Sequence, residues 1–186
     1  MRSATADRAD GWAGRGSMRL DGNAHRVRLG YVHVDDAFRH DQGFVRRRGI
    51  GTLFSHYSRV LRPSNPRGRV REYTIGAQYE ATGNDRFTRS LTRIGGVNYG
   101  MLFADGAELR VSGNTTYEQL DTPFGIGPTL TVRPGAYQYE DVGIRYESNQ
   151  SAALSGAIEV NGGEFWTGRQ RTATGNLRYR FSAHVA

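Results

Sequence analysis

Apolar and polar residues alternate along much of the chain with a period of two, which indicates strands with one apolar and one polar face. The clearest case is residues 174–185, where Leu177 and Tyr179 fall on one face and Arg178 and Arg180 on the other. The same pattern predicts strands over 70–81, 97–103, 107–118 and 152–160, and weaker alternation predicts strands over 12–20, 26–34, 50–61 and 137–147. We therefore expect an all-β fold with about nine antiparallel strands.

One of these segments changes phase along its length. In 137–147, Tyr137 and Tyr139 follow one phase, whereas Val142 and Ile144 follow the other. A β-bulge inserts one residue into a strand and moves the following side chains to the opposite face. The pattern therefore predicts a bulge near Asp141.

The connections between the predicted strands differ in length. Asp21-Gly22 and Asp105-Gly106 are dipeptides typical of tight hairpins, and Ser148-Asn149-Gln150 is a further short turn. Longer connections are expected at 35–49, 82–90, 120–136 and 162–173. Short turns at one rim and long loops at the other are typical of an up-and-down transmembrane β-barrel.

Strand length and side-chain type favour a membrane barrel over a soluble one. Strands of ten to twelve residues match the roughly 9–11 residues that cross a bilayer at a tilt. Aromatic residues cluster near strand ends, as an interfacial girdle requires, and the candidates are Tyr73, Tyr79, Tyr99, Phe103, Phe165 and Trp166. The polar faces carry many charges, and the candidates for lumen-lining residues are Glu72, Glu80, Glu108, Arg110, Arg178 and Arg180.

Composition narrows the chemistry further. The net charge is +7, and all 25 basic residues are arginine, so lysine nucleophiles and the P-loop lysine are excluded. The chain has no cysteine, which excludes disulfides and thiol catalysis. The arginines are spread among acidic residues along the chain, so we do not expect nucleic-acid binding.

The segment Phe38-Arg39-His40-Asp41-Gln42-Gly43-Phe44-Val45-Arg46-Arg47 resembles a motif of a known family. The family comprises C-terminal outer-membrane β-barrel domains of unknown function that follow a family 9 carbohydrate-binding-like module. Three later segments are also similar: 117–124, 134–137 and 162–168. The resemblance covers roughly residues 25–186 and implies a loop motif formed by Phe38, Gly43, Phe44, Val45 and Arg46. It also implies that further strands and a sugar-binding-like domain precede this chain.

The resemblance and the odd strand count lead to one expectation for domain organisation. Residues 1–11 are expected to be a frayed N-terminus, without the apolar region of a signal peptide. Residues 12–186 are expected to form part of a larger barrel, because bacterial single-chain barrels have an even number of strands.

Three charged clusters are candidates for a more specific site. Asp35, Asp36, His40 and Asp41 could bind a divalent cation, although we favour a solvated turn. Arg46, Arg47 and Arg48 could contact lipopolysaccharide phosphate or fold into the lumen and pair with carboxylates, and the two interpretations remain open. Glu118 with Asp121, and Glu140 with Asp141 and Glu147, could form a glycosidase pair, but we favour charged lumen residues.

The expected function follows from these points. We expect a monomeric barrel of the bacterial outer membrane with a structural or transport role, in contact with the lipid bilayer and with lipopolysaccharide or saccharide. We expect no catalytic residues, no metal and no cofactor. Two alternatives remain: a soluble β-barrel that binds an apolar ligand, and the barrel part of a hydrolase acting on polysaccharide.

Overall fold

The chain folds almost entirely into antiparallel β-strands, which confirms the predicted all-β class. The computed structural model describes residues 2–3, 11–39, 47–65, 67–126 and 130–181. The long strands are β2 (Gly11–Asp21), β3 (His25–Val34), β4 (Ile50–Leu61), β5 (Val70–Asn84), β6 (Ser90–Phe103), β7 (Glu108–Leu120), β10 (Gly135–Glu147), β11 (Leu154–Phe165) and β12 (Gly168–Tyr179). The short strands are β1 (Arg2–Ser3), β8 (Phe124–Ile126) and β9 (Leu130–Val132).

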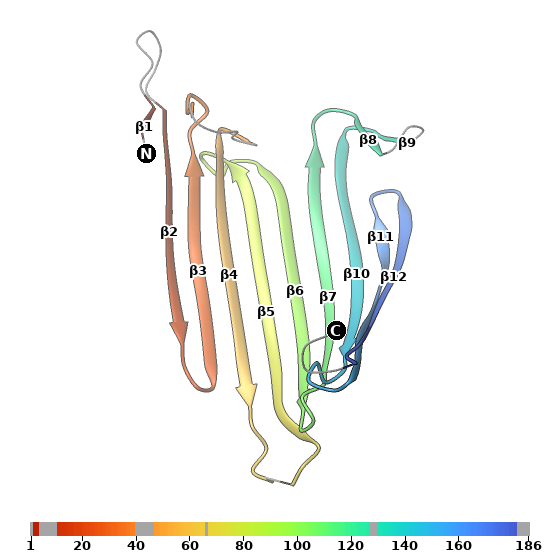
Figure 1. Ribbon diagram of the computed structural model, residues 1–186. Coiled ribbons are helices and arrows are strands. Elements are labelled where there is room, and N and C mark those ends of the chain that lie inside the picture. The colour runs from red at the N-terminus through yellow and green to blue at the C-terminus, as the bar shows by residue number, and fades with distance from the viewer. Residues whose placement is uncertain (1, 4–10, 40–46, 66, 127–129, 182–186) are drawn as a thin grey trace.

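The nine long strands form one up-and-down sheet (Figure 1). Each strand pairs with the next along the chain, and β7 pairs with β10 because β8 and β9 form a separate small hairpin between them. This topology confirms the predicted strand number and connectivity. β1 adds only two residue pairs at the edge of β2.

The polar stretch near the C-terminal end was misjudged from the sequence. Residues 162–173 were expected to be a long loop, but β11 and β12 continue through it and meet in the two-residue turn Trp166–Thr167. β12 ends at Tyr179, which confirms the first part of the strand predicted over 174–185, whereas residues 182–185 lie outside the described residues. The connection expected at 82–90 is shorter in the structure, because β5 continues to Asn84 and β6 begins at Ser90, which leaves 85–89 as the connection.

The connections gather at two ends of the sheet (Figure 1). One end carries the connections 22–24, 62–69, 104–107 and 148–153, and the other carries 35–49, 85–89, 121–134 and 166–167. Long loops were expected at this second end. The prediction is correct for 35–49 and 121–134, but the connections 85–89 and 166–167 are short.

The predicted bulge near Asp141 is also wrong. β10 pairs residue by residue with β7 from Gly135 to Glu147, without a register shift. Tyr137 and Tyr139 lie on the polar face of β10, together with Asp141 and Arg145. The sequence pattern had placed the two tyrosines on the apolar face. The irregularities of the described strands lie in the β5–β6 pair, between Val70 and Glu72 and between Thr82 and Gly83.

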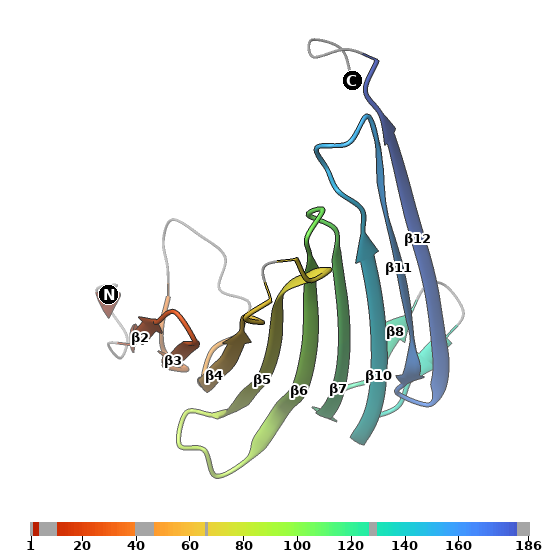
Figure 2. The same cartoon turned by 90° about the horizontal axis from the view of Figure 1, so that it is seen from below.

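The sheet is curved and open (Figure 2). Its hollows are lined mainly by side chains of the polar face, so that face is concave and the apolar face is convex. Within the described part of the chain, no strand pairs with the outer edge of β12, and only β1 pairs with the outer edge of β2. The expected barrel closure is thus not seen in this sheet. None of the described residues belongs to a helix long and apolar enough to span a membrane.

The single sheet has almost no hydrophobic core. Among the described residues, the buried apolar side chains are Phe38, Val60, Ala107 and Val132, which lie far apart in the sheet and its loops. No large side chain is completely buried in that part of the chain. A soluble domain normally packs a second layer against the apolar face of a sheet, and the residues that the structure describes form no such layer.

Candidate functional site: the concave polar face

The two faces of the sheet differ sharply, as β10 illustrates. Side chains of successive residues point to opposite faces of a strand. Val142, Ile144 and Tyr146 lie on the convex face and are 55%, 50% and 41% exposed. Their neighbours Asp141 and Arg145 lie on the concave face and are half-buried. On β10 the polar side is therefore the more enclosed one, which is the reverse of a strand in a water-soluble fold.

The convex face carries a band of exposed apolar side chains across the sheet. Tyr73 and Tyr99 stack near one end of the band, with ring centroids 6.2 Å apart. Other members from β2 to β12 are Met18, Leu20, Leu29, Leu53, Ile75, Val97, Val111, Ile158, Val160, Leu177 and Tyr179. Arg59, two residues before the end of β4, interrupts it. Toward the 121–134 end the same face becomes charged, with Arg93, Glu140, Glu164, Arg169 and Arg171.

The middle of the concave face is a layer of amides that lie over glycines. Three asparagines pair directly across strands with glycine: Asn98 with Gly76, Asn114 with Gly96, and Asn161 with Gly143. A Cβ atom built on any of these glycines would lie 2.4–2.6 Å from the oxygen of the paired asparagine. The missing side chains therefore leave room for the amides to lie flat against the sheet.

The amides are linked to one another and to a carboxylate. The Gln78 amide donates to Asn114 Oδ1 at 3.4 Å, and Asn114 Nδ2 donates to Asp141 Oδ1 at 2.9 Å. These three residues lie in one row across β5, β7 and β10, and the row continues to Arg28 and His56. The row thus runs from basic residues through amides to an acid, and it presents donors and acceptors to any solute in the hollow of the sheet.

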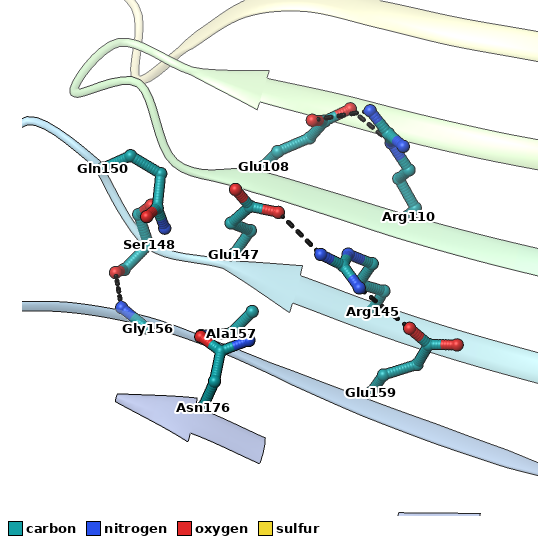
Figure 3. Close-up of polar contacts among 10 residues, drawn as sticks. All are labelled: Glu108, Arg110, Arg145, Glu147, Ser148, Gln150, Gly156, Ala157, Glu159 and Asn176. Carbon is teal, nitrogen blue, oxygen red and sulfur yellow. Dashed lines mark hydrogen bonds and ion pairs between the residues drawn. The ribbon is translucent and has the colours of Figure 1, made fainter. Parts of the chain in front are cut away.

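A second group on this face is an arginine–carboxylate network (Figure 3). Arg145 donates to Glu159 at 2.9 Å and to Glu147 at 3.0 Å. Arg110 donates to Glu108 on the same strand at 2.5 Å and 2.8 Å. Glu108, Arg110, Arg145 and Glu159 help to line a hollow of about 590 Å³ that extends from β3 to β11. Basic and acidic groups are balanced here, so this part of the face carries little net charge.

A third group lies where the 121–134 connection meets the sheet. Trp166 Nε1 donates to Glu118 Oε2 at 3.0 Å, and the Tyr139 hydroxyl donates to the same oxygen at 3.4 Å. The rings of Phe124 and Phe165 pack against Trp166 with centroids 5.1 Å and 4.5 Å away. Glu118 therefore fixes an aromatic cluster at this end of the concave face.

The structure places most of the residues predicted to line the lumen on one face of the sheet. Glu72, Glu80, Glu108, Arg110 and Arg178 lie on the concave face. Arg180 follows the end of β12, where its backbone N–H donates to the carbonyl of Ala153. Glu72 pairs with Arg62 at 2.9 Å.

The aromatic girdle candidates fall into two groups. Tyr73, Tyr79 and Tyr99 lie on the convex face. Phe103 ends β6 and borders a small pocket together with Tyr146. Phe165 and Trp166 instead belong to the Glu118 cluster on the concave side, so they do not fit a girdle on the outer surface. Sequence alternation could not place them, because it read the segment around them as a loop.

The loop motif is only partly visible in the described residues. Phe38 is 4% exposed, and the turn that contains it packs against the backbone of Gly11, since a Cβ atom there would lie 2.2 Å from the Phe38 nitrogen. Gly43, Phe44, Val45 and Arg46 lie outside the described residues, as do His40 and Asp41 of the acidic cluster. In the part of the chain that is described, no group of three or more His, Cys, Asp or Glu residues could hold a metal ion.

The carboxylates considered as glycosidase pairs differ in their surroundings, and Asp141 and Glu147 lie on the same face of β10. Asp121 forms an ion pair with Arg89, and Glu118 is occupied by Trp166 and Tyr139. Glu140 and Asp141 point to opposite faces of β10, so they cannot flank one sugar. Comparison of the chain with protein-family models, with curated proteins and with solved structures finds no match in any of the three.

Proposed function

We propose that this sheet is a segment of a bacterial outer-membrane β-barrel with a structural or transport role. Its convex face contacts lipid and its concave face lines a water-filled lumen. The observation that carries the proposal is the inverted pattern of exposure on β10, where Val142 and Ile144 are half exposed and Asp141 and Arg145 are more enclosed. A bilayer removes such an apolar face from water, and burial stabilises by about 25 cal/mol per Å² of apolar surface.

The dimensions of the strands support the same interpretation. The nine long strands have 10 to 15 residues, and a tilted transmembrane strand needs about 9–11. The convex face becomes charged at Arg93, Arg169 and Arg171, toward the 121–134 end. We assign this end to the outer surface of the cell, because bacterial barrels carry their longer loops there.

A barrel in lipid has no free edges, because each unpaired backbone group in the bilayer costs several kcal/mol. The outer edge of β12 must therefore pair with another strand in the membrane, and so must that of β2 beyond its contact with β1. The proposal requires these strands to come from the same polypeptide or from a second copy. Cross-linking of edge positions in vesicles distinguishes the two sources.

The alternatives receive less support. A soluble barrel for an apolar ligand needs apolar side chains on its concave face, where this sheet has arginines, carboxylates and amides. A hydrolase needs two carboxylates that are free to act, and both Glu118 and Asp121 are engaged. The transport role is passive, with the charged groups of the lumen selecting solutes by size and charge.

Refolding with and without detergent micelles tests the proposal. Far-UV circular dichroism reports the sheet, and heat-dependent gel mobility reports a closed, detergent-resistant fold. We expect sheet structure and a heat-modifiable band only in detergent. Cooperative folding in plain buffer would overturn the proposal, because an exposed apolar face could not then be its stable surface.

A further inference from the structure

A cluster of arginines lines the concave face at the β2–β3 side of the sheet. Arg15 and Arg19 come from β2, and Arg26 and Arg28 come from β3. Together with His56 they border a hollow of about 690 Å³. Arg26 and His56 also border the hollow of the arginine–carboxylate network, whereas Arg15, Arg19 and Arg28 border only this one.

The charge of this hollow is only partly compensated. Of its four arginines, Arg19 pairs with Asp21 at 2.5 Å. Within the described part of the chain, Arg15, Arg26 and Arg28 have no carboxylate in ion-pair range, although Glu80 also borders the hollow. Arg110 and Arg145, in contrast, are both paired with glutamates. The side chains of Arg15, Arg26 and Arg28 are exposed to solvent in this hollow. A concave surface that carries unpaired arginines attracts anions.

Two of these arginines are held in place without using their donors. The guanidinium carbons of Arg15 and Arg28 each lie 5.4 Å from the centroid of the Phe54 ring. The ring itself lies over Gly30, where a Cβ atom would be 2.1 Å from Phe54 Cζ. Because a cation–π contact leaves the N–H groups free, both guanidinium groups remain able to bind an oxoanion through two parallel hydrogen bonds.

We propose that the hollow formed by Arg15, Arg26, Arg28 and His56 binds the oxoanion group of a soluble solute, such as a phosphate, sulfate or carboxylate. The inference deepens the proposed function, since it gives the charge class of the solute, and it rests on that function for the concave face being water-filled. Lipid headgroups are not the source of the anion, because the convex face is the one that contacts lipid.

Calorimetric titration of inorganic pyrophosphate into the detergent-refolded chain tests this proposal. We expect saturable binding that weakens at least tenfold in the triple variant Arg15→Gln/Arg26→Gln/Arg28→Gln. The control variant Arg86→Gln/Arg169→Gln/Arg171→Gln removes the same charge from other exposed positions, and it should bind within about twofold of the unaltered chain. Addition of vesicles with an anionic headgroup should not compete.

Two results would overturn the inference. One is the absence of saturable binding by folded protein, and the other is an equal loss in both triple variants, which would indicate diffuse charge attraction. The folding state is checked first by heat-dependent gel mobility, so failure of the anion site is separable from failure of the barrel proposal. If the chain folded in plain buffer, the barrel proposal would fail while the titration could still be performed.

Discussion

Gly163 on β11 faces Asp141 on β10 so closely that a Cβ atom built on the glycine would lie 2.5 Å from the Asp141 Cα and 2.3 Å from the carbonyl oxygen of Glu140. These are backbone atoms of a paired strand, which cannot move aside alone. The Asp141 carboxylate accepts a hydrogen bond from Asn114, so the close approach also positions the acidic end of the amide row.

Replacement of this glycine should therefore separate β10 from β11 locally. We expect Gly163→Ala to lower the free energy of unfolding by about 1–3 kcal/mol, the usual cost of overpacking. Gly162→Ala is a matched control, because its Cβ would face the convex side with the nearest atom, Arg171 Cγ, 3.9 Å away. Urea unfolding of the detergent-refolded protein measures both, and equal effects would show that the close approach at Gly163 is not a constraint.

The Arg145 network should contribute modestly and in a salt-dependent way. Arg145 is 42% exposed and its partners Glu147 and Glu159 are 35% and 38% exposed, so water screens these ion pairs. We expect Arg145→Gln to lower the free energy of unfolding slightly at low salt and by less at 1 M salt. Arg178→Gln, on the same face, has no ion pair among the described residues and should change stability little. A salt-independent loss at Arg145 would contradict the ionic explanation.

Charge insertion should distinguish the two faces of a single strand. Ala173 and Thr174 are neighbours in the middle of β12, and they pair with Val160 on the convex face and Glu159 on the concave face, respectively. We expect Ala173→Arg to cost about 2–4 kcal/mol in phospholipid vesicles, as for arginine at the midplane of a membrane barrel. Thr174→Arg should cost far less, since it places the cation beside Glu159. Similar costs for the two variants would argue against a lipid-facing convex surface.

The Glu118 cluster can be followed by tryptophan fluorescence. Trp12 and Trp166 are the two tryptophans of the chain, so Trp12→Phe leaves Trp166 as the sole reporter. In that background, Glu118→Ala removes the acceptor of the indole N–H and should cost about 1.5–3 kcal/mol. Acrylamide quenching of Trp166 should also increase. Glu118→Gln retains an acceptor oxygen and should behave nearly like the unaltered protein; an equal change in both would show that the hydrogen bond does not fix the ring.

Alternation was sufficient to predict the number of strands and most of their positions. The bounds of β4 were predicted correctly as 50–61. The prediction failed where glycines occupy both faces and arginines occupy the convex one, as around Gly162, Gly163 and Arg169. There the period-two signal disappears, although the backbone continues as strand. A sequence pattern also cannot distinguish a bulge from aromatic residues on a polar face, which is why Tyr137 and Tyr139 suggested a phase change.

The sequence predicted which face of the sheet carries the candidate site, but not how the residues of that face are grouped. The alternation of side chains along each strand placed Glu72, Glu108 and Arg110 on the polar face. The division of that face into a basic hollow and a balanced network depends on which strands are neighbours. Phe54 meets Arg15 and Arg28 only because β2, β3 and β4 pair in the observed register. The long-range contact between Trp166 and Glu118 was equally hidden, because it joins residues 48 positions apart.

The most direct test of the central claim compares two neighbouring positions on β11. Ala157 lies on the concave face and Ile158 on the convex face, where it is 55% exposed. The chain has no cysteine, so Ala157→Cys and Ile158→Cys can each carry a single fluorescent label after reconstitution into vesicles. A lipid-facing convex surface predicts that nitroxide-labelled lipid quenches the probe at 158 and that aqueous iodide quenches the probe at 157. Quenching of the probe at 158 by iodide alone would contradict the claim.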